Sequence, residues 1–176
     1  MKIRKIEIER DGWWIGAGTL LLGGLLIITV LVLTCGNAHG AEAPIDWSKI
    51  PLFQKTVALT LIGEAAGEGK EGIYAVGCVI QERSIKTGLR PSRICKIPKW
   101  FSVWNGTSRA SLENKFRAPL WQHRYAIELA KQIVDGKPLK REVVKNANHY
   151  CTLETHPNQI MTDIVVIGHH QFYKAL

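Results

Sequence analysis

The chain has 176 residues, enough for one domain of about 130 residues and an N-terminal leader. Its 23 Lys and Arg residues against 15 Asp and Glu residues give a net charge of +8, which suits an anionic partner such as nucleic acid, acidic lipid or bacterial wall. The sequence contains no nucleic-acid-binding motif, so we expect no nucleic-acid partner.

The first 40 residues have the pattern of a signal peptide or a membrane anchor. A charged start ends in the tryptophans at 13–14, and residues 15–34 form an uncharged apolar stretch. Such a stretch is long enough to span a bilayer, and tryptophans are common at the membrane interface. The small residues within 38–40 also offer a cleavage site. A cleaved signal and a retained anchor both stay open. Either would export residues 41–176 to the periplasm or cell envelope.

After a linker at residues 41–52, a domain is expected over residues 53–176. Apolar residues at helical spacing predict three helices in it, over 53–62, 71–87 and 119–135, with Gly88 and Gly136 ending the last two. Residues 89–118 are predicted to be mostly irregular. The β-branched and aromatic residues of 160–166 and 170–173 predict a short β-hairpin. The expected fold class is therefore mainly α (α+β), with a small β-hairpin after the helices.

Glu64 ends the apolar run of the first helix and is the candidate catalytic residue. Glycines follow it at 67, 69 and 72, so the backbone is free to turn just past the carboxyl group. Apolar walls around a carboxyl disfavour its charged form. A carboxylic acid that keeps its proton near neutral pH is what general-acid cleavage of a glycosidic bond requires. A glutamate near a helix end is also often a solvated surface residue, so both interpretations stay open.

Residues 99–105 (KWFSVWN) form an aromatic cluster that is the second candidate feature. Aromatic faces stack on sugar rings, and Ser side chains hydrogen-bond to sugar hydroxyls. Phe101, Ser102 and Trp104 are therefore candidate substrate-binding residues. The alternative is that the rings cap the hydrophobic core.

Histidines and a thiol gather late in the chain, at His149, Cys151, His156, His169 and His170. Their spacing matches no standard zinc pattern, and no CxxC pair is present. A zinc-dependent or Cys/His-dependent wall hydrolase is therefore the least favoured alternative, and we expect no metal ion and no cofactor.

Three cysteines lie in the expected domain. Cys78 lies in an apolar helical run and is predicted to be a small core residue. Cys95 and Cys151 fall in expected loops, and in an exported domain they could form a disulfide.

Several short motifs occur in one order along the chain. Residues 64–68 read EAAGE, residues 71–76 read EGIYAV and residues 167–174 read IGHHQFYK. Together with Phe101-Ser102 and the A-x-x-Y of residues 147–150, they resemble motifs of the SleB-type cell wall hydrolases, the catalytic domain of spore cortex-lytic enzymes and related lysins. That family has E-A-R-G-E, E-G-x-x-A-V, Q-F-S, A-x-x-Y and I-G-N-H-x-F-Y-K. The resemblance covers about residues 54–176.

The chain departs from the family pattern at several positions. Ala66 replaces the usual Arg, Glu82 stands where Asn is common, and His169 replaces Asn. Lys99-Trp100 replaces the residues before Phe-Ser, and the usual Tyr-Asn-Pro stretch becomes residues 151–157. These departures keep the glutamate and bear on how a saccharide is recognised.

The resemblance implies a lysozyme-like fold that cleaves the bond between N-acetylmuramic acid and N-acetylglucosamine in peptidoglycan glycan strands. It implies a lytic transglycosylase or muramidase in which Glu64 acts first as acid and then as base, without a second catalytic carboxylate. Glu68 would then cap a helix or orient the substrate, and Tyr150 and His170 would help to bind it.

Two further questions stay open at this level. A cationic domain of this fold is also consistent with a non-catalytic module that binds peptidoglycan. The biological setting is equally undecided between cell-wall remodelling and phage-type lysis by an endolysin. The expected partners are peptidoglycan and, through residues 15–34, a membrane.

Overall fold

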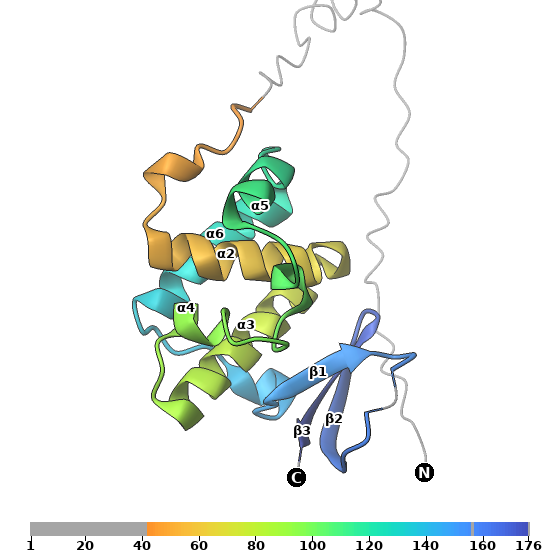
Figure 1. Ribbon diagram of the computed structural model, residues 1–176. Helices are drawn as coiled ribbons and strands as arrows, with labels where there is room; N and C mark the ends of the chain where they lie inside the picture. The colour runs from red at the N-terminus through yellow and green to blue at the C-terminus, as the bar shows by residue number, and fades with distance from the viewer. Residues whose placement is uncertain (1–41, 156, 176) are drawn as a thin grey trace, which may run out of the picture. The chain divides into compact units, whose positions relative to one another are not determined.

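The computed structural model describes residues 42–155 and 157–175, and the expected leader lies outside them. The described chain is mainly helical with one small sheet, which confirms the predicted fold class (Figure 1). The helices are α2 (Leu52–Ala65), α3 (Gly69–Thr87), α4 (Pro91–Ile94), α5 (Arg109–Lys115) and α6 (Trp121–Val134). The 3-10 turns are η1 (Trp47–Lys49), η2 (Ala66–Glu68), η3 (Ser102–Trp104) and η4 (Arg141–Val144), and the strands are β1 (His149–Thr152), β2 (Met161–Ile167) and β3 (His170–Ala175). Over these ranges no helix combines the length and apolar character of a membrane span.

The three predicted helices are α2, α3 and α6, and they pack on one another to form the core. Val57, Leu59 and Leu61 of α2 are fully buried, as expected from the apolar run. Phe53 is an exception, because it lies in the first turn of α2 and is 50% exposed. Gly88 ends α3 in the left-handed conformation, with φ of 69°, as its position predicted.

The sheet has three strands in the order β1-β3-β2, and both pairings are antiparallel. The predicted hairpin is β2 and β3, whereas β1 was not predicted. Tyr150 of β1 and Val165 of β2 both pair with Phe172 of β3, which is fully buried. Phe172 belongs to the hydrophobic core, so it packs β3, and with β3 the sheet, against the helices.

The cysteines differ in part from the prediction. Cys78 is buried in α3, as expected. The sequence left open whether Cys95 and Cys151 form a disulfide, and in this structure both are free. Cys95 is fully buried at the end of α4, and burial raises the pKa of its thiol to about 12. Cys151 lies on β1, where its sulfur contacts the Gln171 amide at 3.3 Å.

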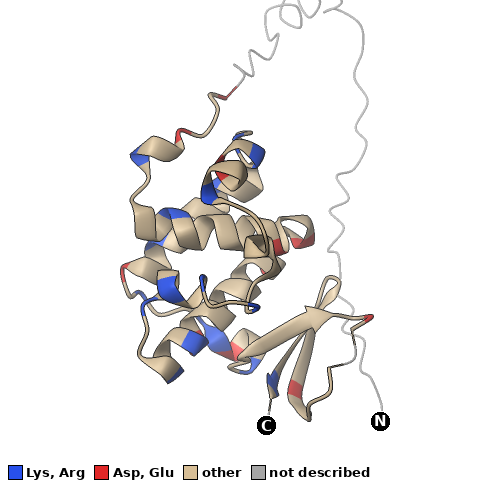
Figure 2. Cartoon of the chain, viewed as in Figure 1, with Lys and Arg blue, Asp and Glu red and all other residues tan. Residues whose placement is uncertain are grey.

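Charged residues are unevenly distributed over the described part (Figure 2). Acidic residues gather at the C-terminal end of α2 and in η2, where Glu64 and Glu68 lie. Basic residues gather on α4 and in the segment after it. Both regions lie on the helical part of the described chain.

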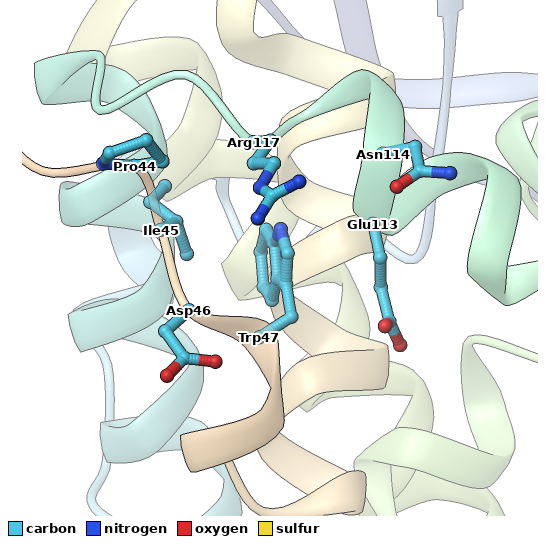
Figure 3. A pocket seen from close by; sticks show the side chains of 7 residues that line it. All are labelled: Pro44, Ile45, Asp46, Trp47, Glu113, Asn114 and Arg117. Atoms are coloured by element: carbon cyan, nitrogen blue, oxygen red, sulfur yellow. The ribbon is translucent and has the colours of Figure 1, made fainter.

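The segment expected as a linker packs against the helical domain. Ile45 and Trp47 are 8% and 5% exposed and belong to the core, and the Ile45 amide donates to the Arg117 carbonyl at 2.9 Å. Figure 3 shows the Arg117 side chain directly above the ring of Trp47. Residues 44–47 and three residues in and after α5 line a hollow of about 440 Å³ here. The domain therefore includes residues ahead of position 53.

Candidate active site

Glu64 lies in the last turn of α2, half-buried, and its carboxyl group accepts three hydrogen bonds from distant parts of the chain. The Ser102 hydroxyl and the Val103 amide of η3 donate to Oε1 at 3.0 and 2.7 Å. The Tyr150 hydroxyl of β1 donates to Oε2 at 2.8 Å. Both carboxylate oxygens are therefore held in place by three donors from two other elements. The prediction had envisaged only apolar walls around this carboxyl group.

A glycine beside Glu64 allows η3 to approach it. A Cβ atom at Gly63 would lie 2.1 Å from Cγ2 and 2.7 Å from Cβ of Val103. Such distances are far below van der Waals contact, so Val103 occupies space that only a glycine leaves free. The backbone of η3 can then come close enough for the Val103 amide to reach Glu64.

Tyr150 is positioned by the sheet. Its ring stacks on Phe172 with centroids 5.6 Å apart and also lies 6.3 Å from the Phe101 ring. Burial raises the pKa of Tyr150 well above its usual value, and the neighbouring Glu64 carboxylate acts in the same direction. The hydroxyl therefore keeps its proton and stays able to donate to Glu64 at any physiological pH.

Glu68 connects the helices to the turn between β2 and β3. Its Oε2 accepts a hydrogen bond from the His169 amide at 2.7 Å. A Cβ atom at Gly168 would lie 1.9 Å from the same oxygen, and Gly168 has φ of 58°. Both the lack of space and the left-handed backbone therefore require glycine at this position. Glu68 occupies the N-cap position of α3, but its side chain makes no capping hydrogen bond. Of the two roles expected for Glu68, capping is therefore wrong.

The Glu68 contact makes stability depend on pH in a defined window. The hydrogen bond from the His169 amide is the main cause that lowers the pKa of Glu68 below its ordinary value of 4.5. Its stabilisation is fully present above pH 4.5 and is lost as the pH falls through the lowered pKa. We expect Glu68→Gln to lower the melting temperature at pH 7, with a difference from wild type that shrinks below pH 4.5. Thermal unfolding across pH measures this, and Glu128→Gln, an exposed glutamate on α6, is the control.

His170 lies between the two glutamates. Its ring packs edge-on against Tyr150 at 5.6 Å, and its Nδ1 atom lies 3.8 Å from Oε1 of Glu68. That nitrogen is buried and has no hydrogen-bond partner among the described residues. Glu64, Tyr150, His170 and Glu68 thus form a continuous row of contacts from α2 to the β2–β3 turn.

The aromatic cluster divides into different environments. Phe101 is 2% exposed, so the prediction that its face stacks on a sugar is wrong. It lies 5.2 Å from the buried guanidinium of Arg83, which also stacks on Trp100. Trp104 is half-buried, its indole N–H donates to Thr60 Oγ1 at 2.9 Å, and the Lys96 ammonium lies over its ring at 3.7 Å. One face of Trp104 is therefore already occupied.

Two residues that depart from the family motifs, Glu82 and His169, make contacts away from the Glu64 carboxyl group. Glu82 is buried in α3 and forms ion pairs with Arg141 and, at 3.6 Å, with Lys86. His169 contacts Glu68 mainly through its backbone amide, and its side chain is 81% exposed. Neither residue bears directly on the Glu64 carboxyl group.

The histidines and the thiol do not gather at one point. His149 stacks on Tyr173 at 5.7 Å, His169 and His170 lie at Glu68, and His156 is outside the described residues. Among the residues that the structure describes, no three His, Cys, Asp or Glu side chains are arranged to hold a metal ion.

Sequence reasoning missed two contributors to this site. The Val103 donor is a backbone amide, which no side-chain pattern reveals. Gly63 could have been recognised from the sequence. A glycine inside a helix lowers helix stability by up to about 1 kcal/mol relative to alanine, and it often marks a close approach of another segment.

A mainly helical domain with a carboxyl group held between a helix end and a small sheet defines a candidate hydrolytic site. The chain belongs to the cell wall hydrolase family, whose model matches residues 67–173. The match confirms the SleB-type resemblance. The family implies peptidoglycan as the substrate. The match includes Glu68, Ser102 and Tyr150 and begins just after Glu64. Searches of curated proteins and of solved structures found no match.

Proposed function

We propose that this cell wall hydrolase cuts the glycan strand of peptidoglycan, with Glu64 as its single acid and base. The observation that carries the proposal is the alignment of the Glu64 carboxyl group by Ser102, Val103 and Tyr150. A carboxyl held by donors on both oxygens is preorganised, which a surface glutamate is not. The lysozyme-like fold and the cut between N-acetylmuramic acid and N-acetylglucosamine are part of the proposal.

The donors indicate which oxygen carries the proton. The Val103 amide can only donate, so Oε1 is always an acceptor. The proton of the acid form therefore belongs on Oε2, beside the Tyr150 hydroxyl, which can donate or accept as needed. Glu64 would pass this proton to the bridging glycosidic oxygen as the bond to the anomeric carbon breaks.

The second half of the reaction returns a proton to Glu64. In a transglycosylase, the 6-hydroxyl of the muramic acid sugar attacks its own anomeric carbon and loses its proton to the carboxylate. In a muramidase, a water molecule attacks the anomeric carbon and loses its proton to the carboxylate. Neither route requires a second catalytic carboxylate, and Glu68 is engaged by His169 instead.

Removal of the Tyr150 hydroxyl should weaken this arrangement without abolishing it. A hydrogen bond to a charged group contributes about 1.5–3 kcal/mol, so we expect Tyr150→Phe to lower kcat by about tenfold or more. The pH dependence of kcat should shift as well, because Oε2 loses its partner. Tyr125→Phe is the matched control, since that half-buried hydroxyl lies on α6 and has no contact with Glu64. Equal rates and pH profiles for both variants would remove Tyr150 from the mechanism.

Mass spectrometry of digested wall tests the proposed function itself. Anhydro-muropeptides would identify a lytic transglycosylase, and reducing ends a muramidase. Wall that remains bound but uncut would contradict the proposal and favour the non-catalytic binding module, which the net charge of +8 also suits.

We also propose that the domain works outside the cytoplasm, where peptidoglycan lies. The apolar stretch at residues 15–34 supports export, either as a signal or as an anchor. N-terminal sequencing of the protein recovered from cell envelopes distinguishes a removed leader from a retained one. Recovery of the protein in the cytoplasm alone would contradict export.

A further inference from the structure

Two neighbouring hollows lie along the start of α2 and the helix α4. One, of about 400 Å³, is lined by Leu52, Phe53, Thr56, Ser92, Arg93, Lys96, Trp104 and Arg109. The other, of about 260 Å³, shares Phe53 and Ser92 and adds Arg90, Pro91 and Val134. We refer to the two hollows together as the basic groove.

The basic groove carries positive charge without matching negative charge. Four of its lining residues are cationic and none is acidic. Arg109 pairs with Glu113 at 3.3 Å, whereas Arg90, Arg93 and Lys96 form no ion pair with any described residue. An anionic ligand would therefore find three cations that are not already neutralised.

Two of these cations lie over aromatic rings that line the groove. The Lys96 ammonium lies 3.7 Å from the centre of the Trp104 ring, and the Arg90 guanidinium lies 5.7 Å from that of Phe53. Phe53 is also 50% exposed, so the groove offers an apolar surface beside its charges. A chain that alternates carboxylates with small apolar groups matches this surface.

Trp104 links the basic groove to the candidate active site. Its indole N–H donates to Thr60, which lies four residues before Glu64 on α2. Residues four apart share one face of a helix, with side chains about 5–6 Å apart. Trp104 also belongs to η3, which supplies two of the donors to Glu64. Thr56, the lining residue of α2 nearest to Glu64, lies eight residues before it, so a ligand in the groove would lie about two helical turns, roughly 12 Å along α2, from the Glu64 carboxyl.

We propose that the basic groove binds the acidic peptide that peptidoglycan carries on its glycan strand. This proposal rests on the proposed function, because the peptide is attached to the sugar whose bond Glu64 would cut. Its carboxylates would pair with Arg93, Lys96 and Arg90, and its small apolar side chains would contact Phe53. The concave shape of the groove suits a peptide better than the flat surface of an anionic bilayer.

Binding of a synthetic acidic wall peptide to the full-length protein tests the proposal without requiring catalysis. The probe is compared with the same peptide whose carboxylates are amidated, by calorimetry and by tryptophan fluorescence. We expect the amidated peptide and the double variant Arg93→Gln/Lys96→Gln each to show affinity lowered about tenfold, since two exposed ion pairs are lost. Lys137→Gln/Lys140→Gln removes two exposed charges at the same spacing near η4, and should bind as wild type does.

Cleavage assays on two substrates separate this proposal from the function of Glu64. On wall with its peptides, the Arg93/Lys96 double variant should lose about tenfold in kcat/KM, whereas on glycan strands stripped of peptide it should match wild type. Equal losses on both substrates would show that the variant disturbs η3 rather than peptide binding, and would overturn the proposal.

Two other results would also overturn it. One is equal binding of charged and amidated peptides. The other is a double variant that still binds the peptide but no longer binds anionic phospholipid vesicles. That result would assign the groove to a membrane. If wild-type protein cuts neither substrate but still binds the acidic peptide through Arg93 and Lys96, the proposed function fails while the groove assignment stands.

Discussion

Replacement of Glu64 by Gln is expected to lower the rate of peptidoglycan cleavage by about 10²–10⁴-fold, the range in which general acid–base catalysis contributes. The amide has the shape of the carboxyl group but cannot supply the proton that the leaving oxygen needs. Ser102, Val103 and Tyr150 would still surround the side chain, so binding of the wall should change much less than kcat.

Zymography and rate measurements on purified wall check this expectation. Glu128→Gln makes the same chemical change on the exposed face of α6, and it should clear wall as wild type does. Melting temperatures close to wild type for both variants would show that folding is intact. Equal clearing by Glu64→Gln and wild type would remove Glu64 from the chemistry.

Substitution of Gly63 by Ala should have the second-largest effect, because it acts on the geometry around Glu64 without touching the carboxyl group. The new Cβ would lie 2.1 Å from Val103 Cγ2, so η3 must move outward. The Val103 and Ser102 donors move with it. A displacement of about 1 Å at a catalytic site can cost about 10²-fold in rate, and overpacking typically destabilises by about 1–3 kcal/mol.

Gly67→Ala is the matched control for this experiment. Gly67 lies four residues further along, and a Cβ atom there would meet nothing within 4 Å. We expect Gly67→Ala to keep both activity and melting temperature. If Gly63→Ala kept full activity as well, the close approach of η3 would not be needed for positioning Glu64.

The long elements of this fold could be predicted from the sequence and the short ones could not. The helices α2, α3 and α6 run over 14, 19 and 14 residues. A strong one-sided apolar pattern marks α6, whereas α2 is buried at every position from 56 to 62 and is revealed by the length of its apolar run. The helix α4 and the strand β1 have only four residues each. Such short segments form because tertiary contacts hold them, as the pairing of β1 with β3 does.

The candidate site could also be predicted only in part: single residues were found, but not how they come together. Glu64 stood out from its apolar run and its glycines, and Ser102 and Tyr150 followed from the family motifs. Their meeting at one carboxyl group joins positions 38 and 86 residues away from Glu64, which no local pattern encodes. Phe101 was misjudged because an aromatic residue in a loop can face either sugar or core. Here the buried guanidinium of Arg83 and the ring of Tyr150 enclose it.

The contact between Glu68 and the β2–β3 turn has a consequence for how relatives of this chain can vary. An oxygen of Glu68 occupies the space that any side chain at position 168 would need. A relative with a larger residue at 168 must therefore shorten or lose the acid at position 68. Its turn would then need another acceptor for the amide at position 169. Positions 68 and 168 should consequently covary across the family, although 100 residues of sequence separate them.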